Sequence, residues 1–224
     1  MDLARIVRPS AEPRPAEPAA VVRRRRVVVA ATLAIGTALL AATLAVPTGS
    51  DAFTVLGLAV AATWVVGSLL SGPLHLGRSR GEPSGRREVL GPVVLGVVAY
   101  LGFLAAYLGA REVPGLAGAL ESILGKADAG PLALVLFVAL VNGAAEEVFF
   151  RGALHSAFGP SDPARNATVV YVLVTVATLN VALVAAAAVM GTVFALERLA
   201  TRGVLAPMLT HLTWSTLMLL ALPR

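Results

Sequence analysis

The chain has 224 residues, of which 57% are hydrophobic and 14% are charged, whereas about a quarter of the residues in a soluble domain are charged. This composition argues against a water-soluble enzyme and favours an all-α, polytopic bundle of transmembrane helices. The formal net charge is +5, but the arginines stand in runs beside apolar stretches, where they contact lipid headgroups, so we expect no nucleic-acid partner. Cysteine is absent, which excludes disulfides, thiolate metal ligands and cysteine nucleophiles.

The order of the apolar segments predicts about seven membrane spans. Residues 1–22 contain prolines among alanines and charges, and we expect a disordered cytoplasmic tail there. A set of N-terminal transmembrane helices over 23–110 and a core over 111–222 follow. The predicted spans are Val27–Val46, Ala52–Leu70, Val89–Leu108, Pro131–Phe158, Ala167–Asn180, Val181–Leu199 and Val204–Leu222. The shorter segment Pro114–Lys126 carries Glu121 and is typical of an interfacial helix.

Arginine placement predicts the orientation of the bundle. The runs at 23–26 and 78–87 fall on one side of the membrane, together with Arg165, Arg198 and Arg202, whereas the loop 47–51 has no basic residue. The positive-inside rule then places the N-terminus in the cytoplasm. Of the 18 basic residues all but Lys126 are arginines, and a composition rich in alanine, valine and arginine favours a GC-rich bacterial genome, so we expect the bilayer to be a bacterial plasma membrane.

The fourth predicted span contains Glu146, Glu147 and Arg151 in an otherwise apolar helix. A charged side chain at the centre of a bilayer costs about 2.5 to 3.5 kcal/mol on insertion scales, so such residues usually pair, face the bundle interior and have a function. Glu147 and Arg151 are spaced i and i+4, which predicts an ion pair that tunes the site. Glu146 points about 100° away from that face and is left free, which suits a general base. A purely structural polar cluster is the alternative.

The seventh predicted span contains a second polar pair, His211 and Ser215, again spaced i and i+4. A rise of about 1.5 Å per residue places His211 about 11 Å from the inner end of its helix and Glu146 about 16 to 18 Å from the inner end of its own. The two side chains are therefore expected at depths that allow them to meet.

These motifs resemble those of the CPBP family of intramembrane proteases, also called the Abi or CAAX-protease family. Two glutamates followed after three residues by an arginine match Glu146, Glu147 and Arg151, and the last motif is matched at His211 and altered at Ser215. The middle motif departs from the pattern, because Asn180 stands where the family has a histidine. His155 is the alternative source of that missing histidine.

The resemblance implies an intramembrane endopeptidase that hydrolyses a peptide bond of a membrane protein or peptide within the lipid bilayer. The implied mechanism has Glu146 activate water, Asn180 orient the water or the base, and His211, helped by Ser215, donate to the oxyanion. A metal-bound mechanism is also described for the family. Catalytic zinc usually has three protein ligands, and Glu146 and His211 are the two good candidates here, so we expect no cofactor, with zinc as the alternative.

Two other functions remain open at this point. A catalytically inactive relative would act as a membrane scaffold or partner-binding protein. The replacement of the middle-motif histidine by Asn180 favours this function. A transporter or proton relay would also use buried carboxylates.

Overall fold

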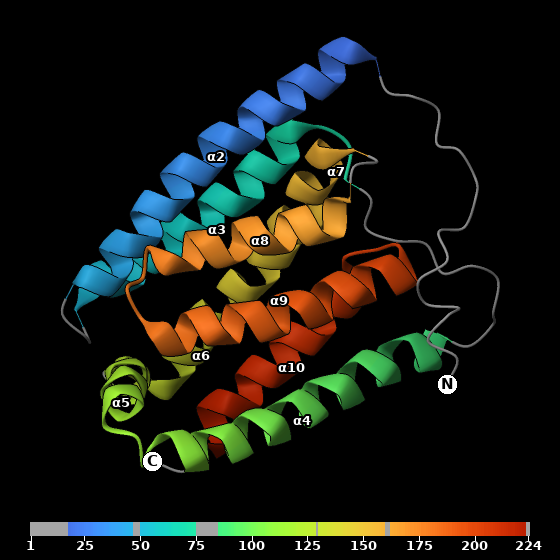
Figure 1. The fold of residues 1–224 in the computed structure, drawn as a ribbon. Coiled ribbons are helices and arrows are strands. Elements are labelled where there is room, and N and C mark those ends of the chain that lie inside the picture. Colours follow the sequence, from blue (N-terminus) through green and yellow to red (C-terminus); the bar gives the residue numbers. More distant parts are fainter. Residues whose placement is uncertain (1–17, 47–49, 75–84, 129, 160–161, 223–224) are drawn as a thin grey trace.

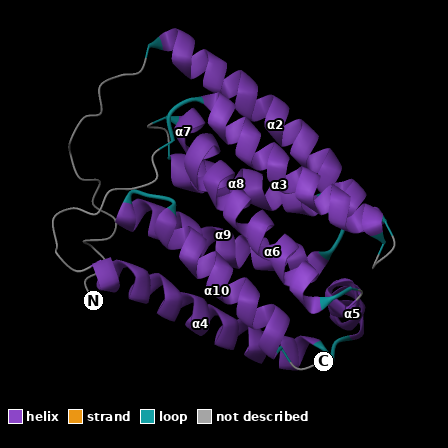
Figure 2. Cartoon of the chain, turned by 180° about the vertical axis from the view of Figure 1, so that it is seen from behind, coloured by secondary structure: helices purple, strands orange, loops and turns teal. Residues whose placement is uncertain are grey.

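The structure, a computed structural model, describes residues 18–46, 50–74, 85–128, 130–159 and 162–222. The regular secondary structure of these residues is helical throughout, as predicted (Figures 1 and 2). The helices are α2 (Ala19–Ala45), α3 (Asp51–Ser71), α4 (Gly85–Ala110), α5 (Pro114–Asp128), α6 (Leu132–Glu146), η1 (Glu147–Leu154), α7 (His155–Phe158), α8 (Pro163–Val176), α9 (Val181–Thr201) and α10 (Leu205–Ala221). Five described helical stretches are long and apolar enough to cross a membrane, and α8 and α10 are shorter, which agrees roughly with seven spans.

Two predicted boundaries were wrong. Helix α2 begins at Ala19, inside the segment predicted as a disordered tail, because the helix continues through Arg23–Arg26; residues 1–17 lie outside the described residues. Helix α8 begins at Pro163, a residue that suits a first helical position, and ends at Val176, four residues before the predicted end. The break before the sixth span is confirmed, because α9 starts at Val181 directly after Asn180.

The continuous stretch of α6, η1 and α7 forms the centre of the bundle. It contacts α2, α3, α8, α9 and α10, whereas α4 packs along α10 at the edge (Figures 1 and 2). Its middle part, Glu147–Leu154, is π-helical, a rare geometry that is frequent at functional sites. The rings of Trp64, Phe149 and Phe150 pack together there, with centroids 4.7 Å and 5.3 Å from Trp64. The charged motif is thereby held in a rigid aromatic core.

The arginines at the start of α2 bind the ends of neighbouring helices. The guanidinium Nε of Arg26 donates to the carbonyl of Ala157 in α7 over 3.1 Å, and Arg25 Nη2 donates to the carbonyl of Pro73 over 3.4 Å. The start of α2, the end of α3 and α7 therefore lie at one end of the bundle. The opposite end contains the end of α2, the start of α3 and helix α5 (Figure 1).

Candidate active site

The predicted ion pair between Glu147 and Arg151 is present and buried. Arg151 Nη1 lies 3.1 Å from Glu147 Oε1, and the two side chains are 3% and 0% exposed. Arg151 Nη2 donates to the carbonyl of Gly191 over 3.2 Å, and the guanidinium also stacks over the rings of Tyr171 and Phe194. The arginine thus connects η1 to α8 and α9 and compensates one buried carboxylate.

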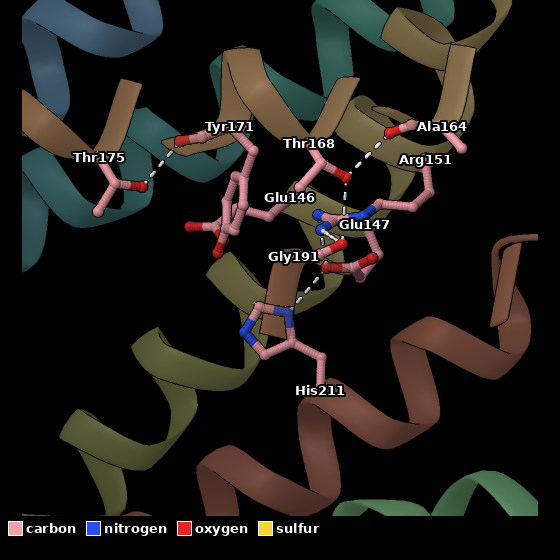
Figure 3. Close-up of polar contacts among 9 residues, drawn as sticks. All are labelled: Glu146, Glu147, Arg151, Ala164, Thr168, Tyr171, Thr175, Gly191 and His211. Carbon is pink, nitrogen blue, oxygen red and sulfur yellow. Dashed lines mark hydrogen bonds and ion pairs between the residues drawn. The ribbon is translucent and has the colours of Figure 1, made fainter. Parts of the chain in front are cut away.

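His211 joins this pair from α10. Its Nδ1 lies 2.9 Å from Glu147 Oε1 (Figure 3). Its ring stacks on Phe194 with a centroid separation of 4.8 Å. Gly143 of α6 lies next to the ring, where an added Cβ atom would meet it at 3.4 Å, an ordinary van der Waals contact. The sequence predicted depths at which His211 and Glu146 could meet, and the hydrogen-bond partner of His211 is instead the adjacent Glu147.

Glu146 points to the other side of the helix, toward Tyr171 (Figure 3). The Tyr171 hydroxyl donates to Glu146 Oε2 over 2.9 Å. The sequence predicted that Glu146 is left free, and this is wrong for one of its oxygens, because Oε2 has a partner on α8.

A cavity of about 400 Å³ opens beside Glu146. Its walls come from α2, α3, α5, α6, α9, α10 and the turn at 178–180, and they are mostly aliphatic. Of the residues that line it, Glu146 alone carries a charge, while Asn142 and Asn180 contribute amides. A largely apolar cavity with a few convergent polar groups is the usual form of a binding site.

Asn180 faces this cavity, but its side chain already has three backbone partners. Oδ1 accepts from the amides of Ala182 and Leu183 over 3.0 Å and 3.1 Å and so caps the start of α9. Nδ2 donates to the carbonyl of Ala119 in α5 over 2.9 Å. The predicted role of Asn180, orienting water or the base, therefore competes with a structural role.

The remaining predicted residues lie farther from the cavity. Ser215 follows His211 by one turn of α10, and it is not among the residues that line the cavity, so its role stays a prediction. His155, the alternative second histidine, begins α7 at the far end of η1 from Glu146. His75 lies outside the described residues.

The donor set does not fit a three-ligand zinc site. Within the described residues no group of three His, Cys, Asp or Glu side chains comes together in a way that could hold a metal ion. Of the two expected ligands, His211 is directed by Nδ1 to Glu147, and Glu146 is bound by Tyr171. We therefore derive no chemical step through a metal.

Sequence reasoning gave no role to three residues of this site, Tyr171, Gly143 and Asn142. Tyr171 belongs to no motif, whereas Gly143 and Asn142 lie in the fourth predicted span just before the glutamates, with Asn142 one turn before Glu146. A signal existed for Tyr171, because a hydroxyl within a membrane helix needs a hydrogen-bond partner. The partner itself, 25 positions earlier in the chain, could not be read from the sequence.

One protein-family model matches the part of the chain that contains these residues. Residues 128–217 match the family model for type II CAAX prenyl endopeptidase Rce1-like proteins. The match includes Glu146, Glu147, Arg151, Asn180 and His211, and it confirms the resemblance to the CAAX-protease family for this part of the chain. No curated protein and no solved structure matches the chain. The fold and the site thus define a helical membrane protein whose residues 128–217 resemble a protease family.

Proposed function

We propose that the protein is an intramembrane endopeptidase in which Glu146 activates a water molecule to hydrolyse a peptide bond of a membrane-associated protein or peptide. The observation that carries the proposal is the position of Glu146, the one charged residue in the lining of an otherwise mostly aliphatic cavity. In the reaction, Glu146 takes a proton from water, the water oxygen attacks the carbonyl carbon, and the proton passes to the nitrogen when the carbon–nitrogen bond breaks.

His211 is suited to stabilise the oxyanion in its charged form. An ionised carboxylate only accepts hydrogen bonds, so Nδ1 donates to Glu147, and Nε2 can donate only when the imidazole is protonated. With a protonated His211, the charges of Glu146, Glu147, Arg151 and His211 sum to zero. This balance limits the cost of holding four ionised groups inside the bilayer.

The test is cleavage of a membrane-peptide library by purified protein in lipid vesicles. Glu146→Gln keeps the shape of the side chain and removes the base, and we expect it to abolish cleavage. Glu112→Gln is the matched control, because the Glu112 side chain is 74% exposed and outside the cavity. Unchanged cleavage by Glu146→Gln would refute the role of this residue, and loss of cleavage with a chelator would refute the metal-independent mechanism.

The capping role of Asn180 favours a second candidate function, that of an inactive relative that acts as a scaffold or binds a partner. In that case Asn180, at the position of the middle-motif histidine, stabilises the fold and takes no part in catalysis. Asn180→His in the same assay separates the two functions. If the wild-type protein cleaves peptides, the peptidase function is supported. If the wild-type protein cleaves none and the Asn180→His variant does, the inactive relative is supported.

We further propose a multi-pass protein of a bacterial plasma membrane with a cytoplasmic N-terminus. The arginines of α2 lie at the end of the bundle opposite the Glu146 cavity, so the cavity would occupy the outer half. The cysteine-free chain allows single-cysteine labelling with a membrane-impermeant maleimide in intact cells. Ser50→Cys is expected to react and Arg202→Cys is not; the reverse pattern would overturn this orientation.

A further inference from the structure

We propose that Asn142 is the residue that orients the attacking water, a role that the family motif would otherwise give to position 180. This inference rests on the proposed peptidase function and names a further residue for it. It concerns the two cavity-lining polar side chains of α6, Asn142 and Glu146, which are spaced i and i+4.

The hydrogen bonds of Asn142 determine which way its amide points. Nδ2 donates to the carbonyl of Gly57 in α3 over 3.0 Å and to the carbonyl of Val138 over 2.9 Å. Both amide hydrogens are thereby used, and a flipped amide would set an oxygen against two carbonyl oxygens. Oδ1 is left as an acceptor, and it has no hydrogen-bond partner among the described residues.

Glu146 presents a second acceptor on the same face of the helix. Tyr171 binds Oε2, and Oε1 has no hydrogen-bond partner in the part of the chain that the structure describes. Four residues of helix separate the two side chains by about 6 Å along the axis, a distance that flexible side chains can bridge through one water. The cavity thus offers two acceptors, and a water molecule has two hydrogens to give.

This arrangement determines the direction of attack. A water that donates one hydrogen to Glu146 Oε1 and the other to Asn142 Oδ1 has its lone pairs directed into the cavity, toward the carbonyl carbon of a bound peptide. Glu146 then takes its hydrogen as the oxygen–carbon bond forms, while Asn142 holds the hydrogen that stays on the oxygen. Asn180 is less suited to this task, because its oxygen accepts from two backbone amides.

The test compares two substitutions in the full chain in lipid. Asn142→Leu removes both the acceptor and the link to α3, whereas Asn142→Asp keeps an acceptor and replaces the two amide hydrogens bound to the carbonyls of Gly57 and Val138 by at most one acid hydrogen. If the acceptor matters, Asn142→Leu lowers kcat about 100-fold with little change in KM, and Asn142→Asp retains most of the activity. Equal losses in the two variants would show that only the link to α3 matters and would overturn the proposal.

A second measurement does not depend on activity. A structure of the protein at a resolution that shows ordered waters is expected to contain one between Asn142 and Glu146, and Asn142→Leu is expected to lose it. If that water is absent from wild type, the inference fails even when the protein cleaves peptides. If the water is present and no peptide is cleaved, the peptidase function fails while the water site stands. Asn166→Leu, outside the cavity, is the matched control and should retain both water and kcat.

Discussion

Replacing Arg151 by methionine tests the energetic role of the buried cluster. The substitution keeps much of the apolar side chain and removes the charge that faces Glu147, a carboxylate with 0% exposure. Removing one partner of a buried ion pair costs about 3 to 5 kcal/mol, and Glu147 would stay buried with His211 as its remaining partner. The expected loss corresponds to a decrease in the folding equilibrium constant of about 10² to 10³·⁵, at 1.4 kcal/mol per tenfold.

The assay is reversible unfolding in mixed micelles, followed by circular dichroism. The double variant Arg151→Met/Glu147→Gln removes both charges, and we expect it to recover at least about 1 kcal/mol relative to Arg151→Met. Arg111→Met is the matched control: its partner Glu112 is 74% exposed, and the loss should stay below about 1 kcal/mol. A loss of the same size at Arg111 and Arg151, or a double variant less stable than Arg151→Met, would refute the reasoning.

Three further predictions use the same preparations. Gly67→Ala should cost about 1 to 3 kcal/mol of unfolding free energy, because its Cβ would overlap a side chain of α2, whereas Gly102→Ala, with nothing within 4 Å, should not destabilise the protein. Tyr171→Phe removes the hydrogen bond to Glu146 and should lower kcat by about 10- to 100-fold; an unchanged rate would exclude a catalytic contribution. Asn180→Leu should cost about 1 kcal/mol through the lost helix cap, and unchanged stability would contradict the capping role.

The membrane helices could be predicted from the sequence because they follow from local properties. Long apolar runs determine the spans, and the i to i+4 spacing of Glu147 and Arg151 determines their ion pair. The boundary at Asn180 was also predictable. Asparagine favours the position before a helix, a signal that we read only as the edge of a span.

The partners of the catalytic candidates could not be predicted, because they depend on how distant helices pack. Depth along each helix predicted that His211 could meet Glu146, but it could not identify Glu147 as the partner of the histidine. The choice of Glu147 depends on the rotation of α10 and on the ring of Phe194, which lies against the imidazole. In the same way, the Glu146 cavity is assembled from walls on six helices, whose relative rotation no local pattern specifies.

The π-helical geometry of η1 has a consequence for insertions and deletions. A π-helix joins each amide to the carbonyl five residues earlier, so η1 uses more residues per turn than α6 does. Deleting Val148 would let the segment tighten into an ordinary α-helix, which uses fewer residues for nearly the same rotation, so the two flanks would keep almost the same orientation. Glu147 and Arg151 would then be spaced i and i+3, a spacing that still allows an ion pair. The segment therefore tolerates the loss of one residue better than truncation of Phe149 or Phe150, which are 0% and 1% exposed.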